Sequence, residues 1–143
     1  GVGGVANLFM KMRQSPGRTK AHHIESNSGA PRSHDGLAAV DGMSQLVSVT
    51  ETFVCKDGVT VPHLLRATRG ALFEEAESVG ANALINEQWS CRICGPKHRS
   101  DGTFRVQTRY SATAIRSNRP DPHNPVALDQ VKNVPGLMNI TSR

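Results

Sequence analysis

Hydrophobic and polar positions alternate with a period of two in two stretches of the chain. In residues 46–55 the two alternating sets are Val47, Val49, Phe53 and Cys55 against Ser48, Thr50 and Thr52. In residues 104–114 they are Phe104, Val106, Tyr110, Ala112 and Ala114 against Arg105, Gln107, Arg109, Ser111 and Thr113. This period predicts two strands, each with one buried and one wet face. A third strand is predicted over residues 83–92, which begin Ala-Leu-Ile.

Between the first two predicted strands the apolar period changes to that of a helix. Thr60 suits the N-cap, Pro62 suits the first turn, and Gly80 suits the left-handed residue after the helix. The predicted buried stripe is Leu65, Thr68, Leu72, Ala76 and Val79.

The charges on this helix run against its dipole. Arg66 and Arg69 lie in its first half, and Glu74, Glu75 and Glu77 lie in its last turns. Each misplaced terminal charge costs roughly 0.3–1 kcal/mol. We expect a solvated face that tolerates this cost, with a neighbouring subunit or a cation as the alternatives.

The order β-α-β-β predicts an α+β fold in which the helix packs on a small antiparallel or mixed sheet. Residues 46–117 form this core domain, and a core of about 70 residues is marginal enough for oligomerisation to be expected. Residues 1–45 are rich in Gly, Ser and Pro and predict a flexible extension. Residues 118–143 contain four prolines and predict an extended tail that wraps its own core or a neighbouring subunit.

The helix, the run Gly80-Ala81-Asn82-Ala83-Leu84-Ile85, a strand, a loop and a strand ending in residues 111–115 together resemble a known family. They are similar to the YbjQ-like family of heavy-metal-binding proteins, with its RcsF-like α/β domain, over residues 61–117. The resemblance implies a compact α/β domain and a ring-shaped homo-oligomer, with a pentamer as the expected size. The chain departs from the family in its N-terminal segment, its Pro-rich tail and its cysteine-bearing loop.

Cys91-x2-Cys94-x3-His98 is the sharpest candidate for a metal site. Two thiolates and an imidazole at this spacing suit zinc, with Cys55, His63 or His123 as the fourth ligand. The alternatives are that Cys91 and Cys94 are small residues at the end of a hairpin, or that they form a redox-active pair.

Two glutamates stand in apolar registers. Glu51 shares the face of Val49 and Phe53, and Glu87 shares the expected face of Trp89. If the two strands are neighbours, this pair has a raised pKa and, with His63, suits acid–base catalysis. Alternatively, a twist or bulge puts either carboxylate in water, or each forms a cross-strand ion pair with Arg105 or Arg109.

The net charge is +5, and it is spread along the chain. A basic patch is expected from Arg92, Lys97, Arg99, Arg105 and Arg109. Tyr110 points the other way, so this patch lacks the stacking aromatics of single-strand RNA-binding faces.

These features predict a non-enzymatic, oligomeric metal-binding or interaction protein. The first alternative is a small acid–base enzyme, and the second is a basic nucleic-acid-associated protein. No phosphate loop, nucleophile elbow or dinucleotide fingerprint is present. No apolar run is long enough to cross a bilayer and no secretory signal is evident, so a cytoplasmic location is expected. The basic first 20 residues leave organelle import as an alternative.

Overall fold

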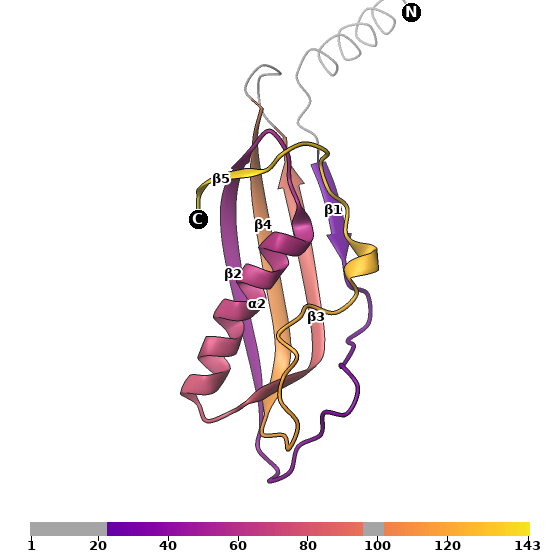
Figure 1. The fold of residues 1–143 in the computed structure, drawn as a ribbon, viewed down its shortest axis with the longest axis vertical. Helices are drawn as coiled ribbons and strands as arrows, with labels where there is room; N and C mark the ends of the chain where they lie inside the picture. Colours follow the sequence, from indigo (N-terminus) through magenta and orange to yellow (C-terminus); the bar gives the residue numbers. More distant parts are fainter. Residues whose placement is uncertain (1–22, 96–101) are drawn as a thin grey trace, which may run out of the picture.

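A computed structural model of the chain describes residues 23–95 and 102–143. They form one antiparallel sheet covered on one face by a long helix (Figure 1). The elements are β1 (His23–Asn27), β2 (Ser44–Lys56), α2 (Val61–Ser78), β3 (Ala83–Cys94), β4 (Thr103–Ile115), a 3-10 turn η2 (Leu128–Gln130) and β5 (Asn139–Ser142).

The five strands lie in the order β1-β3-β4-β2-β5, and every neighbouring pair is antiparallel. The predicted α+β class is therefore confirmed, and the three predicted strands correspond to β2, β3 and β4. β4 is the central strand and pairs with β2 along their whole length, from Ser44↔Ile115 to Lys56↔Thr103. β2 and β3 are consequently not neighbours, because β4 lies between them.

The core lies between α2 and one face of the sheet. Its fully buried side chains include Phe53 and Tyr110 from the strands and Leu64, Leu65 and Leu72 from the helix. Val79 was expected in the buried stripe but is 44% exposed, because it follows the last helical residue.

The two ends of α2 are capped differently. Gly80 has φ +93°, and its N–H donates to Glu77 O at 3.0 Å, as predicted for a left-handed residue at this end. At the other end Thr60 makes no side-chain cap. Instead Asn133, from the C-terminal tail, accepts the Val61 N–H at 2.7 Å. A residue 72 positions away thus does what Thr60 was expected to do.

A β-bulge in β3 determines which side chains face the helix. Ile85 pairs with Thr113 and Gln88 with Ser111, so two residues of β3 stand opposite one residue of β4. Asn86 takes the strained position, with φ 50°. Because of the bulge, the Glu87 side chain faces the core. Ile85, which precedes the bulge, is half-buried and does not share a face with Glu87.

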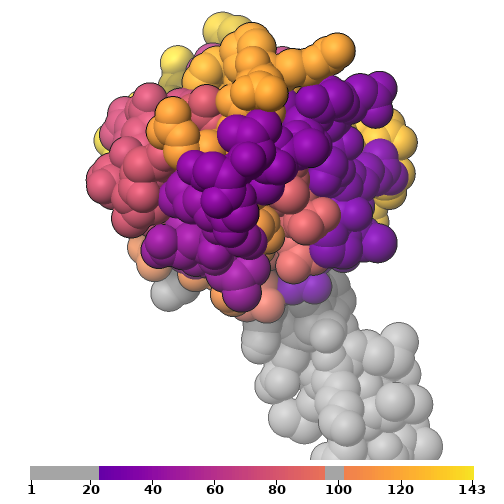
Figure 2. Space-filling view, turned by 90° about the horizontal axis from the view of Figure 1, so that it is seen from below, coloured from indigo at the N-terminus to yellow at the C-terminus, as the bar shows by residue number. Residues whose placement is uncertain are grey.

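Residues 23–45 belong to the folded unit, contrary to the expectation of a flexible extension up to residue 45. β1 pairs with β3, and Arg32 exchanges two backbone hydrogen bonds with Glu87. Figure 2 shows the β1–β2 connection, in purple, spread over the end of the molecule beside the orange segment that follows β4. The prediction was wrong because β1 has no apolar alternation of its own and is held by its partner strand. Residues 1–22, including the transit-like segment, lie outside the described residues.

The C-terminal tail wraps its own core, which was one of its two expected roles. After β4 it runs along the helix-bearing face beside α2, passes η2 and crosses to β2, where it ends as β5 (Figure 1). Val59 and Val134 form a backbone bridge where the tail crosses the turn between β2 and α2. A Cβ on Gly58 would lie 2.6 Å from the backbone of Gly136, so this crossing requires glycine. Among the residues that the structure describes, no helix is both long and apolar enough to span a bilayer.

Candidate functional site

A buried charge cluster lies where α2, β3 and the tail meet, and Arg69 is at its centre. Its side chain is 2% exposed. Nε and Nη2 donate to the two carboxylate oxygens of Glu87 at 2.7 and 3.0 Å. Nη1 and Nη2 donate to the two oxygens of Asp121 at 2.8 and 3.0 Å. One guanidinium therefore clamps two carboxylates, each held at two points.

The remaining polar atoms of the cluster are also paired. Tyr110 Oη donates to Glu87 Oε1 at 2.6 Å and accepts the Val126 N–H at 3.1 Å. Asp121 accepts the backbone N–H of Leu84 at 3.0 Å as well. Within the described residues no buried side-chain nitrogen or oxygen lacks a hydrogen-bond partner.

The protonation states in this cluster follow from its contacts. Burial acts to lower the pKa of Arg69, but the two carboxylates raise it above its ordinary value. Burial acts to raise the pKa of Asp121, but the hydrogen bonds and charge of Arg69 lower it below its ordinary value. Burial and the neighbouring Glu87 raise the pKa of Tyr110. The cluster therefore holds Arg69 protonated, Asp121 ionised and Tyr110 as a hydrogen-bond donor.

The cluster is closed to substrate. The side chains of Glu87 and Asp121 are 0% exposed. His34, whose side chain is 25% exposed, lies nearest, with Nε2 3.7 Å from Glu87 Oε2. Its Nε2 also lies 2.6 Å from Asn124 O and so donates to that carbonyl. We interpret the cluster as a clamp that holds the tail against helix and sheet.

The structure does not bring together the predicted catalytic residues Glu51, Glu87 and His63. Glu51 does share the face of Phe53, but β4 separates it from Glu87. Arg143 binds the Glu51 carboxylate at 3.0 and 3.1 Å. His63 lies on the exposed side of α2. Glu87 is thus paired with Arg69 and Glu51 with Arg143. Neither forms the expected ion pair with Arg105 or Arg109.

The partners that the sequence interpretation missed are Arg69 and Asp121. Arg69 was assigned to a solvated face, although it falls one residue from Thr68 in the buried stripe. Its place next to the buried stripe was the sequence feature that could have indicated its burial. Asp121 stands between two prolines and carries no local sign of burial.

The predicted metal ligands Cys91 and Cys94 point to opposite faces of the sheet. Cys91 is 3% exposed and faces the core, whereas Cys94 is half-buried on the other side of the strand. Burial and the nearby Cys55 raise the pKa of Cys91 to about 12, which disfavours a thiolate ligand. Cys94 Sγ lies 3.9 Å from His23 Nδ1. His98 lies outside the described residues, among which no group of three metal-ligating side chains occurs.

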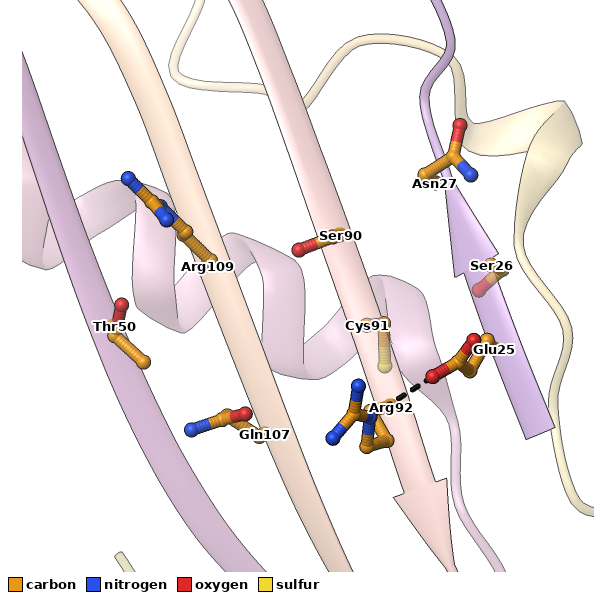
Figure 3. Close-up of a pocket in the computed structure, with 9 residues that line it drawn as sticks. All are labelled: Glu25, Ser26, Asn27, Thr50, Ser90, Cys91, Arg92, Gln107 and Arg109. Carbon is orange, nitrogen blue, oxygen red and sulfur yellow. Dashed lines mark hydrogen bonds and ion pairs between the residues drawn. The ribbon is translucent and has the colours of Figure 1, made fainter. Parts of the chain in front are cut away.

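The face of the sheet opposite α2 is covered by none of the described residues, and we call it the open face. Its exposed residues include Glu25, Asn27, Ser48, Thr50, Thr52, Gln88, Ser90, Arg92, Arg105, Gln107 and Arg109. Figure 3 shows Thr50, Gln107, Arg109 and Ser90 side by side on it, with α2 behind the sheet. They line a shallow hollow of about 430 Å³.

Two positive charges on the open face have no ion-pair partner among the described residues. Arg92 pairs with Glu25 at 2.9 Å, with both side chains more than half exposed. Arg105 and Arg109 form no ion pair within the described part of the chain. No Phe, Tyr or Trp side chain stands on this face among the described residues, since Trp89 and Tyr110 are buried on the other side.

Comparison of the chain with protein-family models, curated proteins and solved structures gives no match. The resemblance to the YbjQ-like family therefore stays a prediction.

Proposed function

We propose that this protein is a non-enzymatic interaction protein that binds an acidic segment of a partner protein on the open face. The observation that carries the proposal is the pair Arg105 and Arg109. They stand exposed on the central strand with no ion-pair partner among the described residues.

The spacing of these arginines fits an extended acidic chain. Residues four apart on a strand are about 13 Å apart, whether they lie in β4 or in a bound extended segment. Carboxylates four residues apart on such a segment can therefore each receive a two-point hydrogen bond from one guanidinium. Around Arg109 the cross-strand neighbours Thr50 and Ser90 supply hydroxyl groups for the backbone of the bound segment.

The two alternative functions have less support. An enzyme needs an accessible reacting group, whereas the buried clamp is closed and fully hydrogen-bonded. A nucleic-acid-binding role has charge in its favour, but the described residues of the open face include no Phe, Tyr or Trp platform for base stacking. Metal binding through Cys91 and Cys94 together would require one of the two side chains to cross the sheet.

A glutamate homopolymer of about 20 residues, labelled for fluorescence anisotropy, tests the proposal, with a lysine homopolymer and a uridine homopolymer of equal length as comparisons. We expect binding to the glutamate polymer that weakens as salt rises. The variant R109Q should weaken binding by about tenfold, which corresponds to about 1.4 kcal/mol for a charged hydrogen-bonded contact.

The matched control is R66Q, which removes the same charge from the exposed side of α2. Equal weakening by R66Q and R109Q would show that only net charge matters and would overturn the proposal. Tighter, Arg109-dependent binding of the uridine polymer would favour the nucleic-acid alternative instead.

A further inference from the structure

Over most of β2 no described residue pairs with its outer edge. β5 pairs with β2 at Val54–Lys56, and residues 44–53 have β4 on one side and no described strand on the other. This stretch pairs with β4 without a register shift, so it is regular along its length. A regular edge presents a row of unpaired backbone N–H and C=O groups, which is a template for another strand.

Most of this edge lacks the features that normally prevent strand pairing. Residues 42–50 contain no charged side chain and no proline, and the charged residue of the free stretch, Glu51, is paired with Arg143. Leu46 is 84% exposed, and Val47 and Val49 are half-buried although they face the helix. The opposite edge, β1, is by contrast only five residues long and carries a charged glutamate. Of the two edges, the uncharged stretch at residues 42–50 suits a partner strand that is itself uncharged.

We propose that β2 pairs antiparallel with β2 of a second copy of this chain, with Ser48 on the two-fold axis. In this register Val47 of each copy lies opposite Val49 of the other, and Leu46 lies opposite Thr50. Glu51 then lies opposite the neutral Gln45. Moving the axis to Val49 would place Val47 opposite Glu51, and moving it to Val47 would place Val49 opposite Gln45. The axis at Ser48 alone matches both valines with valine, which is the arrangement that cross-strand packing favours.

The position of α2 is compatible with this pairing. The chain just after α2 lies at the Ser44 end of β2, because Asn82 donates its N–H to Ile115 O, and Ile115 pairs with Ser44. Figure 1 shows the C-terminal end of the helix extending past the outer side of β2. The two-fold axis at Ser48 puts the two helix ends on the same face of the joined sheet, displaced from the axis in opposite directions along the strands.

The dimer joins two sheets into one and places both open faces on the same side. It does so through β2 alone and does not depend on the proposed binding of an acidic segment. An isologous contact of this kind closes on two copies and excludes a ring.

Disulfide trapping tests the register. In the variant S48C/C94S, oxidation should link two copies rapidly, because directly opposed residues of antiparallel strands have Cα atoms about 4.5–5.5 Å apart, within disulfide range. The control S44C/C94S places its thiol opposite Thr52 of the second copy and should not crosslink. Equal crosslinking of both variants, or of neither, would overturn the register.

The mass in solution tests the contact itself. We expect light scattering after gel filtration to give twice the 15.4 kDa chain mass. S48K should give the chain mass, because it sets two lysines opposite each other on an exposed position that the fold does not use. Q107K, on the exposed face of the central strand, should stay dimeric. A pentameric mass, or a dimer that survives S48K, would contradict the proposal. This outcome is independent of whether the protein binds the glutamate polymer.

Discussion

Arg69 Nη1 and Nη2 reach both oxygens of Asp121, at 2.8 and 3.0 Å, across 52 positions of sequence. The contact joins the middle of α2 to a Pro-rich segment that has no regular structure of its own. Because Glu87 holds the other side of the same guanidinium, one side chain connects the helix, the bulged strand and the tail. A charge that opposes the helix dipole is thus the residue on which the packing of the tail depends.

Removing Arg69 should be among the most damaging single changes in the described core. R69M leaves two buried carboxylates without a counter-charge, and we expect a loss of about 3–5 kcal/mol in the free energy of unfolding. Urea denaturation followed by circular dichroism measures it. R66M, at an exposed position of the same helix, should change stability by less than about 0.5 kcal/mol.

A triple variant, R69M/E87L/D121L, separates charge from packing. It removes the uncompensated charges, so it should recover part of the stability lost in R69M. If R69M and the triple variant were equally unstable, loss of packing volume rather than unpaired charge would be the cause.

Asp121 should make stability depend on acid pH. Its pKa in the folded protein is lowered by Arg69, so its contribution is fully present above its unfolded pKa of about 3.9. The contribution is lost as pH falls through the lower, folded pKa. The stability difference between the native chain and D121N should therefore be largest above about pH 4 and shrink below it. D129N, at an exposed carboxylate, should track the native chain across this range.

Tyr110 should control how firmly the tail is held. Y110F removes the hydroxyl that donates to Glu87 and accepts the Val126 N–H, so we expect a loss of about 1–3 kcal/mol. Hydrogen exchange should speed up at the Val126 amide more than at amides of the β2–β4 ladder. Uniform acceleration at both places would mean that the tail and the sheet unfold as one unit.

The three cysteines should differ sharply in reactivity toward a thiol reagent such as Ellman's. Cys94 is partly exposed and should react within the folded protein, whereas buried Cys55 and Cys91 should wait for unfolding, because burial raises the pKa of both. The variant C94S should lose the fast phase, and C91S should keep it. Protection of Cys91 and Cys94 together by zinc would instead support the sequence-based metal site.

Much of the candidate site could not be predicted from local sequence patterns, and the structure shows why. The wet side of β4, with Arg105 and Arg109, followed from alternation alone. A buried Glu87 was one of the alternatives that its register left open, but its partner was not foreseen, because the bulge at Asn86 and the path of the tail bring it to Arg69. Cys91 and Cys94 looked like a chelating pair while their segment was taken as a loop. Because β3 continues through Cys94, the two side chains point to opposite faces of the sheet.

By itself the sequence determined the α+β class, the three long strands and the end of the helix at Gly80, because periodicity and left-handed glycine are local properties of the chain. Only the tertiary structure decided the strand order, the incorporation of β1, the Asn133 cap and the Arg69 clamp. These depend on contacts between residues tens of positions apart, and their energies come from burial and pairing that no short window of sequence contains. The edge of β2 lies between the two cases: its alternating pattern was visible in the sequence, but that no described strand pairs with it over residues 44–53 followed only from the fold.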